Sequence, residues 1–216
     1  MENILVIEDS QSISAMIKNA LERIDFSVVL CPDFKTAKES LSENQFFAAV
    51  VDMELPDSYW EKTADLVNQY NVPIIIYSAG EYNTAIRKRV LTKNILDFIQ
   101  KKDEKSLNLL VRTIDRLRRN SHMTVLVADD SRTALSQAKF ILEQAKFKVL
   151  TAADGLIALN LLEKNRHISI VITDYEMPHL NGFELVKKIR EEFDSNSMAI
   201  IAVSHPSTSA STSKFL

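Results

Sequence analysis

The stretch FFAAVVDMELP, from Phe46 to Pro56, decides the fold of this chain. An unbroken apolar run from Phe47 to Val51 stops at one carboxylate, Asp52. A short apolar run bounded by a charge and then by a proline is typical of a strand buried in a parallel sheet. Such strands point their carboxyl ends at the crevice where open α/β sheets keep their ligand sites. We therefore expect Asp52 at the mouth of a crevice.

The same pattern returns later in the chain as ISIVITDYEMP, from Ile168 to Pro178, with Asp174 in the place of Asp52. Each of the two aspartates also follows a pair of acids, Glu8-Asp9 or Asp129-Asp130, at nearly the same distance along the chain. The sequence therefore predicts an internal repeat of two units. We place the first domain at residues 1–119, a short linker at 120–123 and the second domain at 124–216.

Each unit alternates short apolar runs with stretches of helical periodicity, which predicts a parallel sheet covered by helices on both faces. The expected strands of the first unit are Asn3–Ile7, Ser27–Leu30, Phe47–Val51, Val72–Tyr77 and Ile95–Ile99, and those of the second are Val125–Ala128, Phe147–Thr151, Ile168–Thr173 and Met198–Val203. Ser10 and Ser131 are expected to cap the first helix of each unit, and Pro32 to open the second helix of unit 1. In unit 2 the first helix carries the apolar stripe Leu135, Ala138, Ile141 and Leu142, and a last helix is expected from Ser207 onward.

Composition excludes several classes of protein. A hydrophobic content of 46% with 25% charged residues indicates a globular protein, and a net charge of −3 gives no general attraction for nucleic acid or for an anionic membrane. The single cysteine, Cys31, excludes an internal disulfide, and three scattered glycines cannot build a phosphate-binding glycine loop. No apolar run is long enough to span a bilayer and the N-terminus shows no leader, so we expect a cytoplasmic protein that contacts no membrane and no nucleic acid.

Three carboxylates should converge at each crevice: Glu8, Asp9 and Asp52 in unit 1, and Asp129, Asp130 and Asp174 in unit 2. Carboxylates this close repel one another unless a cation lies among them. A hard cation with oxygen ligands relieves this repulsion, and Mg²⁺ fits best because it accepts a few carboxylates and bridges to phosphate oxygens.

Other expected strand ends add groups that suit a phosphoryl ligand. Ser78 offers a hydroxyl and Lys101 an ammonium, both at carboxyl ends of strands in the first sheet. Together with a divalent cation, these groups would hold the three oxygens of a phosphoryl group. An aspartate carboxylate can itself be the nucleophile that forms an acyl phosphate.

On these residues both units resemble the receiver domain of two-component response regulators. The residues that carry the resemblance are Glu8-Asp9, Asp52, Pro56, Ser78-Ala79 and Asp97-Phe98-Ile99-Gln100-Lys101 in unit 1, and Asp129-Asp130-Ser131, Asp174 to Pro178, Asn181-Gly182 and Ser204 in unit 2. The resemblance implies two flavodoxin-like, doubly wound parallel sheets with strand order 2-1-3-4-5. The second unit lacks the last strand and helix of that fold, so we expect the chain to be either part of a longer protein or incompletely ordered.

The resemblance also implies roles for the site residues. Asp52 and Asp174 would accept a phosphoryl group from a histidine kinase or a histidine phosphotransfer protein. The ligands of Mg²⁺ would be Asp9 and Asp130 with help from Glu8 and Asp129, together with Asp52, Asp174 and the backbone carbonyls of Glu54 and Glu176. Ser78, Ser204 and Lys101 would contact the phosphoryl group, and Phe98 would change rotamer with it. The module would not be an enzyme beyond its own phosphorylation, would form a homodimer, and would switch a partner or an output domain such as a diguanylate cyclase.

The sequence also departs from the family pattern at several positions. Asp57-Ser58-Tyr59-Trp60 stands where the family has a glycine after the proline, and Lys102 replaces a proline. In unit 2, His205 is bulky for its place beside the hydroxyl, and Lys214 is a poor substitute for the missing lysine. Tyr59 and Trp60 could form an interface or pack over the crevice, and the sequence leaves both possibilities open.

Two alternatives to a pair of active receivers remain open. One unit could be a degenerate receiver that serves only for dimerisation or docking. Less favoured is a Mg²⁺-dependent aspartyl phosphohydrolase in which Glu54 and Glu176 act as the acid and base, because nothing in the sequence resembles a substrate-specificity cap.

Overall fold

The computed structural model describes residues 1–216 except 81–83, 92, 193–197 and 204–216. The chain divides into two compact units, Met1–Arg116 and Leu117–Leu216, and the division falls within one helix, α5. The helix that was expected from Ser207 lies outside the described residues. Among the described residues, no helix combines the length and the apolar character needed to cross a membrane.

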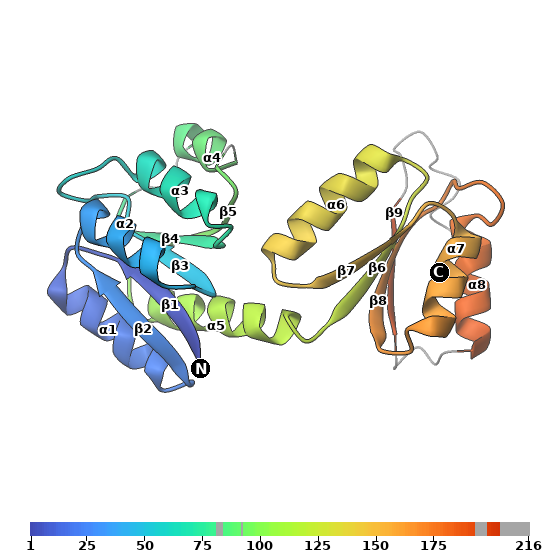
Figure 1. The fold of residues 1–216 in the computed structure, drawn as a ribbon, viewed down its shortest axis with the longest axis horizontal. Helices are drawn as coiled ribbons and strands as arrows, with labels where there is room; N and C mark the ends of the chain where they lie inside the picture. Colours follow the sequence, from blue (N-terminus) through green and yellow to red (C-terminus); the bar gives the residue numbers. More distant parts are fainter. Residues whose placement is uncertain (81–83, 92, 193–197, 204–216) are drawn as a thin grey trace. The chain divides into compact units, whose positions relative to one another are not determined.

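Unit 1 is a five-stranded parallel sheet with helices on both faces (Figure 1). Its elements are β1 (Glu2–Ile7), α1 (Gln11–Glu22), β2 (Phe26–Cys31), α2 (Phe34–Glu43), β3 (Ala48–Val51), α3 (Trp60–Gln69), β4 (Ile74–Ser78), α4 (Thr84–Leu91), β5 (Ile95–Gln100) and α5 (Glu104–Asn120). The strands lie in the order β2-β1-β3-β4-β5, which confirms the predicted topology.

Unit 2 repeats the first four strands of this sheet. Its elements are β6 (Thr124–Ala128), α6 (Arg132–Gln144), β7 (Lys148–Ala152), α7 (Gly155–Lys164), β8 (Ile168–Asp174), α8 (Gly182–Glu192) and β9 (Ala199–Val203). The order β7-β6-β8-β9 matches β2-β1-β3-β4 of unit 1, so the described part of unit 2 is the predicted fold with four strands.

The central strand of unit 1 is as buried as the sequence predicts. All four residues of β3 are buried, and β3 pairs on one side with β1 and on the other with β4. A core cluster joins one face of the sheet to α2, α3 and α4 through residues such as Leu41, Val67 and Val90. Trp60 belongs to this core with 5% of its surface exposed, whereas Tyr59 is 84% exposed. Trp60 is therefore a core residue of unit 1, a position that neither interpretation of this aromatic pair, an interface or packing over the crevice, had named.

The helix starts follow local capping rules. The side chain of Ser10 accepts a hydrogen bond from the backbone N–H of Ile13, and Ser131 caps α6 in the same way, as predicted. The expectation for Pro32 is wrong, because α2 begins at Phe34 and Asp33 is its N-cap residue. An Asp side chain can accept a bond from a first-turn N–H group, which a proline ring cannot do.

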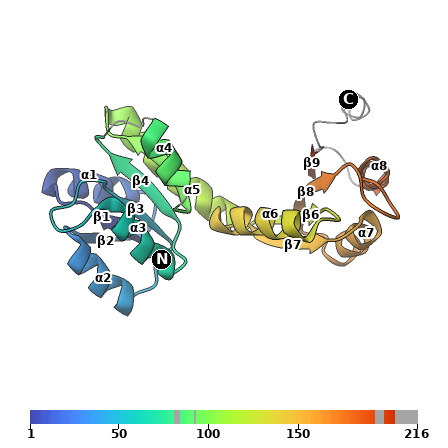
Figure 2. The same cartoon turned by 90° about the horizontal axis from the view of Figure 1, so that it is seen from above.

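The two faces of the sheet in unit 2 are covered differently. On one face α7 and α8 lie side by side (Figures 1 and 2) and bury a core that includes Leu162 and Leu185. On the other face lies α6, of which no residue is fully buried; Ile141 of its predicted apolar stripe is 64% exposed. On β9, Ile201 and Val203 are each 52% exposed.

Candidate phosphoacceptor and metal site

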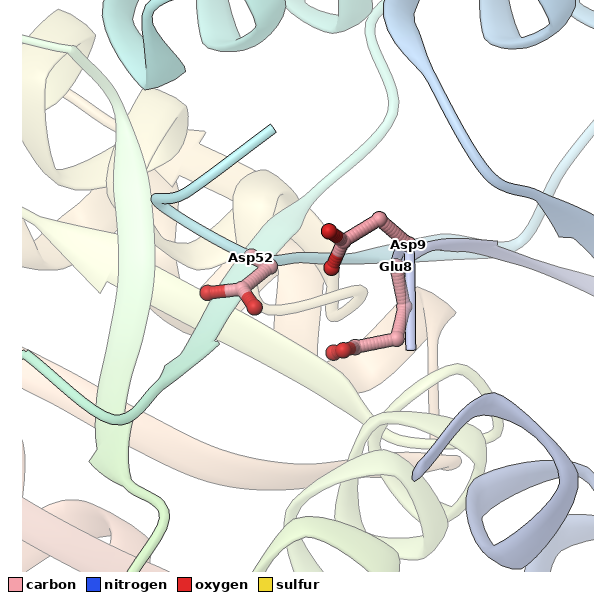
Figure 3. Close-up of side chains that lie close together, drawn as sticks. All are labelled: Glu8, Asp9 and Asp52. Atoms are coloured by element: carbon pink, nitrogen blue, oxygen red, sulfur yellow. The ribbon is translucent and has the colours of Figure 1, made fainter. Parts of the chain in front are cut away.

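The carboxyl ends of β1 and β3 bring three acids together in unit 1. Because β1 and β3 run parallel with Ile7 paired to Val51, the residues that follow them emerge at the same edge of the sheet. Carboxylate oxygens of Glu8, Asp9 and Asp52 all lie within 4.8 Å of one another. Figure 3 shows the side chains of Glu8 and Asp9 extending from the end of β1 toward the side where Asp52 lies.

These three acids differ in their exposure to solvent. Glu8 is 4% exposed and Asp52 is 7% exposed, whereas Asp9 is open to solvent. Burial raises the pKa of Glu8; the hydrogen bond and charge of Lys101 oppose that rise, and the charge of Asp52 adds to it. The carboxylates of Glu8 and Asp52 are therefore nearly excluded from solvent, whereas that of Asp9 is exposed at the mouth of the site.

Lys101 supplies the cation that the buried acids need in this structure. It follows β5 directly, and its backbone N–H donates to the carbonyl of Ser78. Its ammonium lies 2.5 Å from Glu8 Oε2 and 2.6 Å from Asp52 Oδ2, and 5.6 Å from the centre of the Tyr77 ring. Although burial favours the neutral amine, the hydrogen bonds to Asp52 and Glu8 raise the pKa of Lys101, so the lysine is charged.

The other oxygen of Asp52 is held by the backbone. Oδ1 accepts hydrogen bonds from the N–H groups of Met53 at 2.7 Å and Glu54 at 3.4 Å. The Asp52 carboxylate is thus fixed at both ends, with Oδ1 on the loop that follows β3 and Oδ2 on Lys101.

The remaining predicted residues of unit 1 lie around this centre. Ser78 is the last residue of β4 and is fully buried, and its Oγ accepts from the N–H of Gly80 at 3.5 Å. Phe98 is half-buried on β5 and packs against the main core cluster. The side chain of Glu54 is exposed.

Unit 2 assembles the same three acids at the ends of β6 and β8. Carboxylate oxygens of Asp129, Asp130 and Asp174 lie within 4.8 Å of one another. Asp174 Oδ1 accepts from the N–H of Tyr175 at 2.8 Å, as Asp52 does from Met53. Burial, followed by the charges of Asp129 and Asp130, raises the pKa of Asp174, and within the described residues no cation is paired with these acids. The side chain of Glu176 is exposed, and Ser204 lies outside the described residues, as do His205 and Lys214.

Sequence reasoning missed the contacts that Lys101 makes with Glu8 and Tyr77. Lys101 was expected to meet a phosphoryl group, but nothing in the sequence says which acid it meets when no phosphoryl group is bound. The one signal in the sequence for the contact with Tyr77 was its position, directly before the strand-end serine Ser78.

An α/β sheet with this strand order and a strand-end acid cluster defines a receiver-like class of protein. Comparison with known families agrees, because the family described as the response regulator receiver domain matches residues 4–112 and again 125–216. The chain belongs to this family and carries two copies of its domain.

Individual relatives support the same assignment. A chemotaxis protein CheY homolog of Campylobacter jejuni is 44% identical over 82 residues, which is 38% of this chain and 63% of the relative. The two-component response regulator ORR3 of Oryza sativa is 35% identical over 83 residues, which is 37% of this chain and 61% of the relative. The chain thus spans less than two thirds of the length of either relative.

Solved structures also resemble the chain over both units. One of them is a two-component system response regulator/GGDEF domain protein that is 28% identical, with a TM-score of 0.84, and the match covers 100% of this chain and 87% of that one. The repetition of receiver domains predicted from the sequence is therefore confirmed.

Proposed function

We propose that the chain is a receiver module that accepts phosphoryl groups on Asp52 and Asp174 from a histidine kinase or a histidine phosphotransfer protein, with Mg²⁺ as cofactor. Its domains are residues 1–119 and 124–216, joined by a short linker at 120–123. The observation that carries the proposal is the geometry around Asp52, a buried carboxylate held at one oxygen by backbone amides and at the other by Lys101.

That geometry suits a nucleophile. The N–H groups of Met53 and Glu54 fix the rotation of the carboxylate, so Oδ2 points into the space shared with Lys101, Glu8 and Asp9. A carboxylate positioned in this way needs little reorganisation before it attacks phosphorus.

The acid cluster fits a hard divalent cation. Oxygen donors from Glu8, Asp9 and Asp52 are mutually within 4.8 Å, and such donors are the ligands that Mg²⁺ accepts. In our proposal Asp9, Asp52 and the carbonyl of Glu54 hold the ion, and Glu8 assists. When bound, the ion would neutralise the charge of the phosphoryl oxygens as they approach the acids.

The transfer step is a displacement at phosphorus. An oxygen of Asp52 forms a new bond to phosphorus while the bond from phosphorus to the donor's imidazole nitrogen breaks, and the donor leaves as imidazole. In the product, the Lys101 ammonium pairs with a phosphoryl oxygen, and the Ser78 hydroxyl donates to another. We also propose that Phe98 changes rotamer as Ser78 and Lys101 move toward the phosphoryl group.

Unit 2 is proposed to work in the same way, with Asp174 as acceptor, Asp130, Asp129 and the carbonyl of Glu176 at the metal, and Ser204 at the phosphoryl group. The alternative from the sequence stays open, in which unit 2 is a degenerate receiver used only for docking or dimerisation. Labelling of Asp174 decides between the two.

The state of the module would be transmitted to a partner or to an output domain. The similarity to a response regulator/GGDEF domain protein supports an output of that class, and we propose a diguanylate cyclase in the full-length protein. We also propose that the module is a homodimer, which light scattering of the phosphorylated and unphosphorylated chain would test.

Peptide mapping after treatment with acetyl phosphate and Mg²⁺ tests the acceptor residues. We expect phosphoryl groups on the peptides that contain Asp52 and Asp174, each lost in the matching Asp→Asn variant. Label on a different residue would contradict the proposal. The docking alternative predicts instead that Asp174 stays unlabelled and that Asp174→Asn behaves as the wild type, and a phosphohydrolase would turn over a phosphomonoester many times per site.

A further inference from the structure

The loops that follow the two acceptor aspartates are closed by different contacts in the two units. Each loop leads from a strand-end aspartate to a helix, and Trp60 and Gly182 lie the same number of residues after Asp52 and Asp174. In both units the loop also supplies the N–H group that binds the acceptor carboxylate. The position of this loop therefore sets the position of the nucleophile.

In unit 2 the loop is closed by backbone contacts that require a glycine. The N–H of Gly182 donates to the carbonyl of Tyr175 at 3.0 Å. A Cβ atom at Gly182 would lie 2.1 Å from the carbonyl oxygen of Asp174, which no other residue could tolerate without a shift of the backbone. Close backbone approach of this kind is a physical reason for glycine.

Unit 1 cannot use that closure, because the matching residue is Trp60. Its indole side chain is packed into the core, and the loop forms instead a short antiparallel bridge between Glu54 and Tyr59. Pro56 to Ser58 form the tip of this small hairpin, between the two bridged residues.

Asp57 anchors this tip. Its Oδ1 accepts a 2.9 Å hydrogen bond from the N–H of Phe34 and its Oδ2 a 3.1 Å bond from the N–H of Lys35. These are two of the first N–H groups of α2, which have no partner within the helix, and they lie at its positive end. Nearby, the Lys62 ammonium lies 4.4 Å from the centre of the Phe34 ring, so α3 also meets the start of α2.

We infer that Asp57 is a positioning residue for the Asp52 site, because it ties the β3–α3 loop of unit 1 to the start of α2 in place of the missing glycine closure. Asp57 is exposed, and its carboxylate oxygens are bound to α2 rather than to the acid cluster. It acts through the loop, whose Met53 and Glu54 amides hold Asp52. In unit 2 the matching residue is His179, in the left-handed conformation with φ 66°; there Asp154 accepts from the N–H of Ile157 in the first turn of α7, and the loop meets the start of α7 through the backbone of Leu180 beside Gly155.

The structure offers a matched control for this inference. Asp33 also places a carboxylate at the start of α2, where its Oδ1 accepts from the N–H and from the hydroxyl of Thr36, each at 2.8 Å, whereas Asp57 reaches the helix from the loop. Asp33→Ala and Asp57→Ala each remove one capping carboxylate from the same helix, and only Asp57→Ala releases the loop.

Two measurements on the full chain test the inference. The first is amide hydrogen exchange, in which we expect Asp57→Ala to speed exchange at Met53, Glu54 and Tyr59 by about tenfold. We expect Asp33→Ala to leave those amides unchanged, and Asp57→Asn to show a smaller effect because its amide oxygen can still accept one bond. Unchanged exchange in Asp57→Ala, or equal changes in both Ala variants, would overturn the inference.

The second measurement is a Mg²⁺ titration followed by the fluorescence of Trp60, the only tryptophan of the chain. This part rests on the proposed function. We expect the Mg²⁺ midpoint to rise about tenfold in Asp57→Ala, at the lower end of the loss seen for residues that orient metal ligands, and less than twofold in Asp33→Ala. If the wild type shows a midpoint and Asp57→Ala does not change it, the result would contradict the positioning role of Asp57 but not the proposed function. A wild-type chain with no midpoint would contradict the proposed function, and the exchange experiment would still decide whether Asp57 anchors the loop.

Discussion

The Lys101 ammonium donates a 2.6 Å hydrogen bond to Asp52 Oδ2, although the two residues come from different strand ends and are 49 positions apart in the chain. Both side chains are about nine-tenths buried, and Glu8 shares the same ammonium. The unphosphorylated site thus holds one cation against two buried acids. In our proposal, a bound phosphoryl group and a divalent cation would change which groups Lys101, Glu8 and Asp52 contact.

Removal of this cation should destabilise unit 1. In Lys101→Ala, the buried carboxylates of Glu8 and Asp52 would face each other without the lysine's charge between them, and loss of one member of a buried ion pair costs about 3–5 kcal/mol. We expect the free energy of unfolding of unit 1, followed by Trp60 fluorescence in urea, to fall by about 3 kcal/mol. Lys102→Ala, which removes an exposed lysine next to it, is the control and should change stability by less than about 0.5 kcal/mol. Equal effects of the two changes would show that the ion pair is not what stabilises the site.

Mg²⁺ should stabilise unit 1 through Asp9. A ligand at 100 times its dissociation constant adds about 2.7 kcal/mol to the stability of the form that binds it. We expect that gain for the wild-type chain and its loss in Asp9→Asn, because Asp9 is the exposed acid of the cluster and is proposed as a direct ligand. Glu43→Gln, at an exposed position at the end of α2, should keep the full gain. Thermal unfolding with and without Mg²⁺ measures both, and an Asp9→Asn variant that keeps the gain would contradict the ligand assignment.

The stability of unit 2 should depend on pH through Asp174. Its folded-state pKa is raised by burial and by its acidic neighbours, so the charged carboxylate costs stability at neutral pH and the protonated one does not. Without Mg²⁺, Asp174→Asn should therefore be more stable than the wild type at pH 7. This advantage should disappear below about pH 4, where the carboxyl group is protonated in both states. Calorimetry across this range checks the sign; an Asn variant that is less stable at pH 7 and equally stable at low pH would contradict it.

A methyl group at Gly182 should disturb the second acceptor site. In Gly182→Ala the new Cβ would overlap the carbonyl oxygen of Asp174, and overpacking of this kind costs about 1–3 kcal/mol. The control is Gly80→Ala, because among the described residues the contact that a Cβ there would make is with Ser78 Oγ at 3.8 Å, an ordinary distance. Thermal unfolding measures both variants, and a Gly182→Ala chain as stable as Gly80→Ala would mean that the backbone adjusts freely beside Asp174.

The features that the sequence predicts well depend on local signals. The unbroken apolar run before Asp52 and its repeat before Asp174 predict two buried strands, and β3 and β8 lie there with the acids at their ends. Serine before a helical stripe predicts the caps at Ser10 and Ser131. Once the strands are parallel, their ends must share an edge, so the convergence of the acids follows from topology.

The features that the sequence does not predict depend on contacts between distant segments. Asp57 looks like an ordinary turn residue, and its bonds to the start of α2 depend on how far the hairpin after β3 reaches. Because Trp60 is buried in the core, the loop before it is closed differently from the loop before Gly182. Composition alone does not tell whether an aromatic residue at the start of a helix is buried or exposed. The exposure of Ile141 depends on what covers α6, which a helical stripe cannot reveal.

The measurement that tests the central claim most directly is the intact mass of the wild-type chain after incubation with acetyl phosphate, once with Mg²⁺ and once with a chelator. The account predicts that the mass rises by up to two phosphoryl groups in Mg²⁺, that the label is removed by hydroxylamine as an acyl phosphate is, and that the mass stays unchanged in the chelator. A mass that does not change in Mg²⁺, or a label that forms equally well in the chelator, would contradict it.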